Sequence, residues 1–344
     1  MPVHKPSWFS QDKVMVSTAP TCGLTKGGRL LPLVNPTTGQ REQVIDPETG
    51  ELVDAINDRL LDDMLALRAG NDTDTLRFID RSEISLRTAV PVYYDLRFDK
   101  AFKAAMATEK FAGFTSATLR DLLRKGVIQI TGGHGSPSQE QRVGDVPYIK
   151  VSDLRAGMVN INPTNRVPLK IAERFWRGDK SGLRPFDILC PERTSKNIGD
   201  FCVLMPGQER ILLTKEVIVI RPGPNAEFDS FYLLWAMTLK LVRDQWKRVI
   251  FMQTNREDVG KRYLELSIPI PKNPKIGHEV SESFRSYYTT IAEARSKLST
   301  YLARENDHHF FVSGAEAPDP LEQAAAAVDD VGALEGDGSD PEEE

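Results

Sequence analysis

The sequence is poor in the residues that build metal sites and disulfides, and it lacks a long apolar run. Its three cysteines, Cys22, Cys190 and Cys202, form neither a CxxC motif nor a Cys/His pattern. We therefore expect buried thiols in a reducing cytoplasm. No apolar run approaches the ~20 residues that span a bilayer, and the first thirty residues lack the hydrophobic core of a signal peptide. We expect a soluble, cytoplasmic protein with no membrane partner.

Histidine is also scarce, and the five histidines are not spaced to act together. Surface or aromatic-packing roles suit them better than metal binding. A metal-dependent nuclease needs an acidic residue at one strand end and an (E/D)-x-K motif on the next strand. Asp187 and Glu192 are not followed by that motif, because residues 193–196 are Arg, Thr, Ser and Lys. The sequence therefore predicts neither a metal site nor nuclease chemistry.

The loop that adenine-N6 methylation requires is absent as well. That reaction uses an (N/D)PP(Y/F) tetrapeptide, whose polar groups accept the target amino group while the aromatic ring stacks on the flipped base. Residues 35–37 and 162–164 are both Asn-Pro-Thr, without the second proline and the aromatic. The Gly-rich residues 131–135 follow an expected strand but continue as loop, so we interpret them as a flexible connection rather than a phosphate cradle. We predict no catalytic residue and no cofactor site in this chain.

Charge is present but unevenly distributed. Residues 313–344 hold eleven acidic residues and no Lys or Arg, so the net charge of −5 becomes +6 over the preceding 312 residues. Residues 108–275 carry 27 basic and 18 acidic residues, a net charge of +9, which suits a polyanion. The acidic tail has too little apolar surface to order and is predicted to be disordered. It is either an inert solubilising extension or a competitor of DNA for the basic surface.

Residues 1–107 have the pattern of a separate, turn-rich unit. Val14, Met15 and Val16 predict a short strand. Residues 35–39 and 46–50 each place Pro after an Asx residue and Gly three positions later, which favours tight turns and a hairpin. Residues 54–68 have apolar side chains at intervals of three and four, which predicts an amphipathic helix.

The middle of the chain alternates short strands with helices. A helix start is expected at residues 115–123, and short β-type runs are expected at residues 127–130 and 146–151. The continuous apolar character of residues 231–241 indicates a packed helix. Residues 264–271, Leu-Glu-Leu-Ser-Ile-Pro-Ile-Pro, predict a closing strand.

Five landmarks in this region resemble the target recognition domain of type I restriction-modification specificity subunits. They are the opening helix, the Val-Pro-Tyr-Ile-Lys-Val-Ser-Asp-Leu segment at 146–154 with Gly157, the strand through Asp187, the helix with Tyr232-Leu233-Leu234, and the two-proline strand. The family has Gly where this chain has Phe186, and residues 191–196 replace its small-residue turn. The resemblance implies an α+β fold with a single target recognition domain at 108–275, a long coiled-coil-type spacer helix at 276–312 and a disordered acidic tail at 313–344.

The N-terminal unit resembles the segment that follows the catalytic domain of some adenine-N6 DNA methyltransferases. The similarity lies in Cys22-Gly23-Leu24-Thr25-Lys26-Gly27-Gly28-Arg29, which follows a strand and precedes a helix. It implies that residues 1–107 dock a partner. The expected partners are a methyltransferase (modification) subunit, which would bind S-adenosylmethionine, and a restriction subunit of the same system.

Three segments of the middle region carry residue types that read DNA. Arg can bind guanine through two hydrogen bonds and Asn or Gln can bind adenine, while Lys and Arg set register on phosphates. For any one residue, a solvated loop charge is the alternative. The candidate DNA-binding residues are Lys150, Ser152 and Arg155; Arg193, Thr194, Ser195, Lys196 and Asn197; and Gln253, Thr254, Asn255, Arg256, Lys261 and Arg262.

A long amphipathic helix is expected from about residue 278 to residue 306. Its apolar positions recur at steps of three and four, and the region 115–271 is not repeated. The helix is expected to pack on its own domain, or to pair with a second copy as a homodimer or with a helix of the catalytic partner.

Together these observations predict a non-catalytic subunit that recognises a sequence in double-stranded DNA within a restriction-modification or related methylation-based phage-defence system. Two alternatives remain open. One is a diverged methyltransferase or nuclease that acts alone, and the other is a protein-interaction adaptor.

Overall fold

The computed structural model describes residues 13–304, apart from residues 26, 70, 72, 86–87, 194–196 and 254–255, and describes only the backbone of residues 252, 253 and 256–258. The chain forms two compact units that meet in sequence after Ala101. Each contains helices and strands, as the α+β prediction requires. The tail predicted to be disordered lies outside the described residues. None of the described helices is both long enough and apolar enough to cross a membrane.

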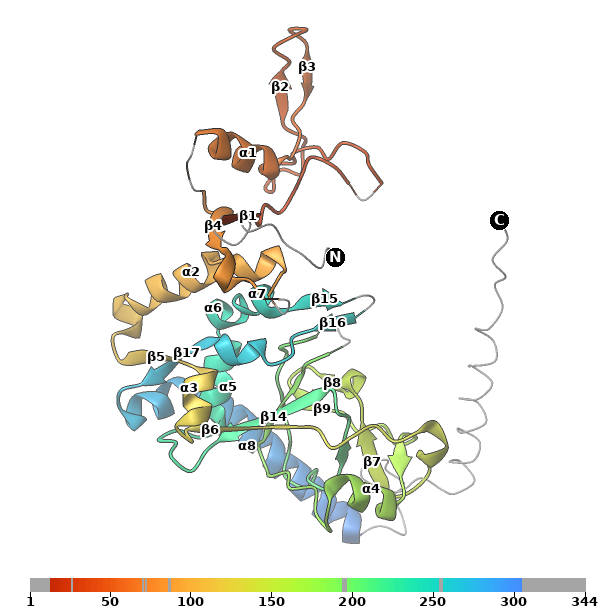
Figure 1. Ribbon diagram of the computed structural model, residues 1–344. Helices are drawn as coiled ribbons and strands as arrows, with labels where there is room; N and C mark the ends of the chain where they lie inside the picture. Colours follow the sequence, from red (N-terminus) through yellow and green to blue (C-terminus); the bar gives the residue numbers. More distant parts are fainter. Residues whose placement is uncertain are drawn as a thin grey trace, which may run out of the picture. The chain divides into compact units, whose positions relative to one another are not determined.

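The first unit contains two antiparallel strand pairs and the helix α1 (Figure 1). Strand β1 (Lys13–Ser17) pairs with β4 (Leu76–Asp80), and β2 (Gln43–Ile45) pairs with β3 (Leu52–Asp54), all antiparallel. The β2–β3 turn is closed by the Gly50 amide donating to the Asp46 carbonyl oxygen at 2.8 Å, which confirms the predicted hairpin. Helix α1 (Arg59–Ala69) begins later than predicted, because residues 52–54 are part of β3.

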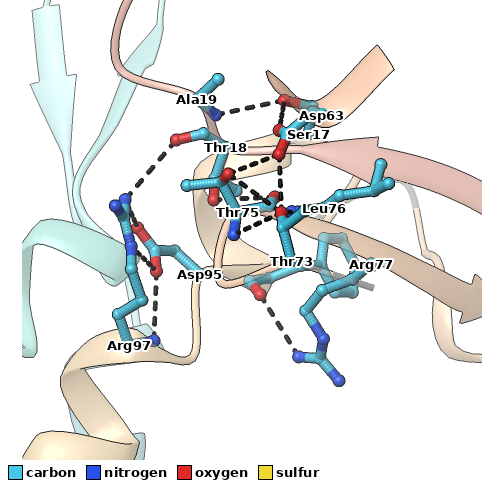
Figure 2. A network of polar contacts seen from close by, with 11 residues as sticks. Ser17, Thr18, Ala19, Asp63, Thr73, Thr75, Leu76, Arg77, Asp95 and Arg97 are labelled. Atoms are coloured by element: carbon cyan, nitrogen blue, oxygen red, sulfur yellow. Dashed lines mark hydrogen bonds and ion pairs between the residues drawn. The ribbon is translucent and has the colours of Figure 1, made fainter. Parts of the chain in front are cut away.

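A buried carboxylate connects α1 to the β1–β4 strand pair (Figure 2). Asp63 is only 1% exposed. Its two oxygens accept hydrogen bonds of 2.6 Å from the hydroxyls of Ser17, Thr73 and Thr75. Burial acts to raise the pKa of Asp63, but these three hydroxyls together hold its pKa below the usual value. The network therefore stabilises the charged form of Asp63.

The remaining elements of this unit are two 3₁₀ helices, Arg81–Glu83 and Pro91–Tyr94, and the start of α2 (Arg97–Met106). Arg97 pairs with Asp95 at 2.6 Å where α2 begins. Cys22 is exposed, whereas Cys190 and Cys202 of the second unit are buried. The prediction of buried thiols was therefore wrong for Cys22, which lies in a turn segment that contributes little to a core.

The second unit is organised around a six-stranded sheet with the order β6-β14-β11-β12-β9-β8. All neighbouring strands are antiparallel except the parallel pair β12–β9. The strands are β6 (Ile128–Gly132), β8 (Leu154–Arg155), β9 (Met158–Val159), β11 (Ile188–Pro191), β12 (Cys202–Val203) and β14 (Val217–Pro222).

The central strands are buried on both faces, which explains their continuous apolar runs. In β14, Ile218 and Ile220 pack into the main core beneath the helices, while Val217 and Val219 pack into a second core on the opposite face. A strand of this kind lacks the polar–apolar alternation of a half-exposed strand.

A smaller layer continues the second unit beyond the second core. It has the strand order β10-β7-β13, formed by β10 (Arg166–Val167), β7 (Val146–Ile149) and β13 (Leu212–Leu213). Helix α4 (Leu169–Trp176) covers it and closes a third apolar cluster. The Val-Pro-Tyr-Ile landmark is therefore a central strand with every residue buried.

The helices cover the main core. They are α3 (Leu119–Arg124), α5 (Ser230–Thr238), α6 (Lys240–Arg243), α7 (Trp246–Val249) and α8 (Pro274–Arg304). Helix α5 confirms the packed helix expected from residue 231, and it lies against α8. Close approach is possible because Gly277 of α8 has no side chain, and a Cβ there would lie 3.3 Å from the Tyr232 ring.

Two ribbons and short 3₁₀ helices complete the second unit. The ribbons are β5 (Phe114–Thr118) with β17 (Ser267–Pro271) and β15 (Phe251–Gln253) with β16 (Arg256–Asp258). The 3₁₀ helices are Glu109–Phe111, Gln139–Gln141, Val151–Asp153 and Arg262–Glu265. The long helix is confirmed from Pro274 to Arg304, and a coiled-coil pairing stays a prediction.

The predicted helix start at residues 115–123 was partly wrong. Residues up to Thr118 form β5, because they pair with β17 about 150 residues later in the chain. The helix begins only at Leu119, and the Thr118 hydroxyl caps it by accepting the Asp121 amide at 3.1 Å. The predicted strand at 264–271 is likewise shorter, since Leu264 belongs to a 3₁₀ helix.

Candidate nucleic-acid interface

The first candidate segment is held by a tight hairpin between β8 and β9. Its two-residue turn, Ala156 and Gly157, has positive φ angles of 52° and 75°, as the type I′ turns favoured by two-residue hairpins require. The Gly157 carbonyl oxygen accepts hydrogen bonds from the Tyr288 hydroxyl of α8 at 3.0 Å and from the Val203 amide at 2.9 Å. The hairpin is thereby fixed to the sheet and to α8.

Two of the predicted side chains are presented to solvent, one by this hairpin and one by the 3₁₀ helix Val151–Asp153 before it. Ser152 and Arg155 are both exposed, and the Arg155 Nε donates to the Ser152 carbonyl oxygen at 2.7 Å. Lys150 precedes them, and its amide donates to an Asp153 carboxylate oxygen at 2.7 Å. Burial raises the pKa of Asp153, although this hydrogen bond opposes the effect. The backbone conformation of 150–155 is therefore locally fixed.

The second candidate segment lies beside the first. The Asn197 Nδ2 donates to the Leu154 carbonyl oxygen of β8 at 3.1 Å. Arg193 is exposed, while Thr194, Ser195 and Lys196 lie outside the described residues. The loop between β11 and β12 is thus attached to the β8–β9 hairpin by a side chain that the sequence had indicated.

The third candidate segment is the tip of the β15–β16 hairpin, where Gln253 pairs with Arg256 in the backbone register. Thr254 and Asn255 lie outside the described residues. At the base of this hairpin, the Val259 amide donates to the Glu192 carbonyl oxygen at 3.3 Å. Since Glu192 immediately precedes Arg193, the second segment is linked to the third as well as to the first.

Lys261 and Arg262 follow the same hairpin but differ from each other. Lys261 is exposed. Arg262 donates from Nε to the Val249 carbonyl oxygen at 3.0 Å, and its guanidinium lies 3.8 Å from the centre of the Phe251 ring. Arg262 therefore holds the base of the hairpin, and a DNA contact by this residue stays a prediction.

Two clefts lie next to these segments. The larger, of about 560 Å³, is lined by residues that include Ser152, Arg155 and Asn197. The smaller, of about 450 Å³, shares Ser152 and Arg155 and adds Lys150 and Arg142. Arg142 was not among the predicted residues. Its guanidinium lies 5.5 Å from the centre of the Tyr148 ring, and no periodicity in the sequence indicates that pairing.

Asp187, which was considered above as a nuclease carboxylate, is buried and bound to arginine residues of its own chain. It is 1% exposed, accepts the Arg184 amide at 2.8 Å and pairs with Arg221 at 2.6 Å. The preceding Phe186 has a φ of 63°, a left-handed conformation that is unfavourable for a residue with a side chain. Within the described part of the chain, no three His, Cys, Asp or Glu residues are grouped to hold a metal ion.

The Gly-rich segment after β6 is a packed connection, and its interpretation as flexible was wrong. The amides of Gly133, His134 and Gly135 donate to the carbonyl oxygens of Val217 and Leu213 at 2.7 to 3.1 Å, so they are not available to cradle a phosphate. A Cβ on Gly133 would lie 1.9 Å from the Thr214 carbonyl oxygen. Glycine is required here for close backbone approach.

His134 has the aromatic-packing role that the sequence analysis favoured. Its ring meets Trp176 edge-on, with ring centres 6.4 Å apart. Nδ1 accepts the Leu213 amide at 2.9 Å, so Nε2 carries the proton that is donated to the Ser181 carbonyl oxygen at 2.9 Å. Burial lowers the pKa of His134, which keeps the ring neutral.

Comparison with known proteins found no matching protein-family model and no matching curated protein. Among solved structures, the S subunit of a type I restriction-modification system from M. genitalium shares 15% identity over 64% of this chain, with a TM-score of 0.37. The HsdS subunit from Thermoanaerobacter tengcongensis shares 16% over 67%, with a TM-score of 0.33. A structure describing assembly of a type I restriction-modification system shares 17% over 67%, with a TM-score of 0.34.

All three are structures of type I restriction-modification proteins. The match covers 50% of each of those chains, so this chain corresponds to about half of their length. At these TM-scores, the structural similarity is too weak to assign any property of those proteins to this chain. The function of this chain therefore has to be inferred from its own residues.

Proposed function

We propose that this chain is the DNA sequence-recognition subunit of a restriction-modification or related methylation-based phage-defence system. It binds a short target in double-stranded DNA and directs a separate adenine methyltransferase subunit to it. The observation that carries this proposal is the linkage of the three candidate segments. Asn197 contacts β8 on one side, and Glu192 contacts Val259 on the other.

The residue types of the joined segments suit direct readout of bases. Gln253 and Arg256 are paired in the backbone register at the tip of one hairpin, and Arg155 belongs to the other. Each good bidentate pair between such a side chain and a base contributes about 1–3 kcal/mol of discrimination. The surrounding Lys and Arg residues add phosphate contacts, so we expect affinity to fall steeply as salt rises.

Catalysis is assigned to the partner. Asp187 is engaged by Arg221, and the Gly-rich amides are engaged by backbone carbonyls. Within the described residues, Asp187 and the Gly-rich amides, which were considered for catalysis, therefore have structural roles. S-adenosylmethionine binds the methyltransferase subunit in this proposal, and this chain is not itself an enzyme.

The N-terminal unit is proposed to dock that methyltransferase, with a restriction subunit as a further partner in the assembly. The β2–β3 ribbon places Val44 opposite Val53 and Ile45 opposite Leu52. Residues directly opposite in an antiparallel pair lie on the same face, so both faces of the ribbon carry branched apolar side chains. All four are exposed, and isolated two-stranded ribbons are marginally stable, which supports a protein partner here.

Helix α8 is proposed to pair with the same helix of a second copy, giving a homodimer through residues 278–306. Its positions 287, 291, 294, 298 and 301 alternate in steps of four and three, which is the spacing of a coiled-coil seam. Tyr287, Leu298 and Tyr301 on this stripe are 55%, 44% and 50% exposed. A homodimer would place one recognition domain on each half of a target.

Selection of bound duplexes from a randomised DNA pool tests the proposed function. The full chain, assembled with its methyltransferase, should enrich one sequence motif, and that motif should contain the adenine that becomes methylated. A pool that stays random after repeated selection would favour an adaptor without DNA specificity. Methyl transfer or cleavage by the purified chain alone would favour the enzyme alternative.

A further inference from the structure

The smaller cleft gathers three cations from separate parts of the second unit. Arg142 follows the 3₁₀ helix Gln139–Gln141, Lys150 follows β7, and Arg155 belongs to β8. All three line the same cleft of about 450 Å³, together with the hydroxyls of Ser136, Ser152 and Thr214. Cationic head groups and hydroxyl donors are the side chains that bind phosphate oxygens.

Two of the three cations, Arg142 and Arg155, are positioned by contacts within the chain. The Arg142 guanidinium lies over the Tyr148 ring, and its buried Nε makes no hydrogen bond within the described residues. Arg155 uses Nε for the Ser152 carbonyl oxygen. Since a guanidinium has five N–H donors, that contact orients the group and still leaves donors for a ligand.

The charged side chains that line the cleft are mainly basic. Glu216 is the one carboxylate among the described lining residues, against three cations. Outside the lining, Glu140 interacts electrostatically with Arg142, and Asp153 interacts with Lys150 and Arg155. The side chains that line the cleft itself therefore carry a net positive charge, three cations against one carboxylate.

We propose that this cleft binds one phosphodiester of the DNA backbone, through Arg142, Lys150 and Arg155. This inference rests on the proposed DNA-recognition function and adds to it the contact that fixes register. The cleft shares Ser152 and Arg155 with the larger cleft, which Asn197 also lines. A strand whose phosphate lies in the smaller cleft is therefore continuous with the segments proposed to read bases.

A phosphate contact has a different signature from a base contact. Lys150→Gln should weaken binding of the selected target and of an unrelated duplex by the same factor, about eightfold at 0.1 M salt. The slope of log affinity against log salt should become shallower by about 0.9. Arg142→Gln should behave alike, and Arg142→Lys should recover most of the affinity because the charge is kept.

Lys125→Gln is the matched control. Lys125 is exposed and lies before the start of β6, whereas Ser136 of the cleft follows the end of that strand. This control should leave both the affinity and the salt slope near those of the wild type. Thermal unfolding of each variant separates a lost contact from a lost fold.

Duplexes with a single neutral methylphosphonate identify the phosphate itself. The wild type should lose about eightfold in affinity at one backbone position, and Lys150→Gln should lose less at that position because only Arg142 and Arg155 still contact the phosphate. Equal losses for the two proteins at every position would overturn the cleft assignment while leaving sequence-specific binding intact. Absence of DNA binding by the wild-type assembly would overturn the proposed function and this inference together.

Discussion

Asp63 is the clearest case of a single side chain that couples the fold to pH. Its three hydroxyl donors favour the carboxylate, so its pKa in the folded state lies below the unfolded value of about 3.9. A group with a lowered folded pKa contributes stability that is present above the unfolded pKa. That contribution is lost as the pH falls through the folded value.

We predict that Asp63→Asn destabilises the protein by about 1–3 kcal/mol at pH 7, because buried hydroxyls lose a charged acceptor. Its loss of stability between pH 7 and about pH 3 should be smaller than that of the wild type. Thermal unfolding across this range measures both effects. Asp62→Asn is the control, because Asp62 is exposed and its pair with Arg59 is long, at 3.4 Å. Identical pH profiles for Asp63→Asn and the wild type would contradict the account.

Phe186 has an unfavourable backbone conformation, but its side chain makes a favourable ring contact. A left-handed φ costs a non-glycine residue about 1–2 kcal/mol, while the Phe186 ring lies 5.0 Å from that of Phe231, centre to centre. The ring contact offsets the strain that Gly would avoid.

We predict that Phe186→Gly is destabilising, but less so than Phe186→Ala, by about 1 kcal/mol. Both variants lose the ring, and only alanine keeps the strain. At Phe201, which is buried and has no positive φ, the order should be reversed, with glycine the more destabilising. Chemical denaturation of the four variants tests the order, and the same order at both positions would show that φ is not the cause.

At the level of elements, the Asn197 contact determines how the β11–β12 loop lies against the β8–β9 hairpin. We predict that Asn197→Ala lowers the preference for the target over an unrelated duplex by about tenfold, equivalent to about 1.4 kcal/mol. The salt slope should not change, because no charge is removed. Competition binding at several salt concentrations measures both quantities. A change in slope without a change in preference would assign Asn197 to phosphate binding instead.

Helix α8 gives a second prediction at this level. We predict that Leu298→Glu raises the dissociation constant of the homodimer by at least about 100-fold, because each copy would bury a carboxylate in the seam. Light scattering during gel filtration measures the change. Ser296→Glu, on the side of the helix away from the stripe, should leave the dimer intact. A wild-type chain that is monomeric at every concentration would argue against the homodimer.

The elements that sequence patterns predicted are those determined locally. The turn at residues 46–50 has its own Asp, Pro and Gly, and the helix beginning at Ser230 has its own N-cap in Asp229 and a continuous apolar run. Strand β5 was misassigned because its partner β17 is distant in sequence. The β8–β9 turn was located from Gly157, but its anchor on Tyr288 depends on packing that no local pattern records.

In the candidate site, too, features determined by local sequence were predicted, and features that depend on packing between distant segments were not. Residue types and their order predicted which segments suit DNA, and Asn197 proved to link two of them. The sequence gave no indication that Arg142 stacks on Tyr148 beside Lys150, because the approach depends on how β7 packs in the second unit. The sequence also did not indicate that Arg262 holds the base of a hairpin through the Val249 carbonyl oxygen, and its DNA contact stays a prediction.

For the whole molecule, charge is divided between a basic recognition region and an acidic tail. We predict that deleting residues 313–344 tightens binding to unrelated DNA by about threefold to tenfold at low salt, because eleven acidic residues no longer compete for the basic surface. Fluorescence anisotropy with a random duplex at two salt concentrations measures the change. Unchanged affinity at low salt would leave the tail as an inert extension.

The central claim is that this chain chooses the DNA sequence while another subunit transfers the methyl group. Mapping methylated adenines in the host genome with and without the gene for this chain tests it most directly. The account predicts that one methylated motif disappears on deletion and returns when the gene is restored. An unchanged set of methylated motifs would contradict it.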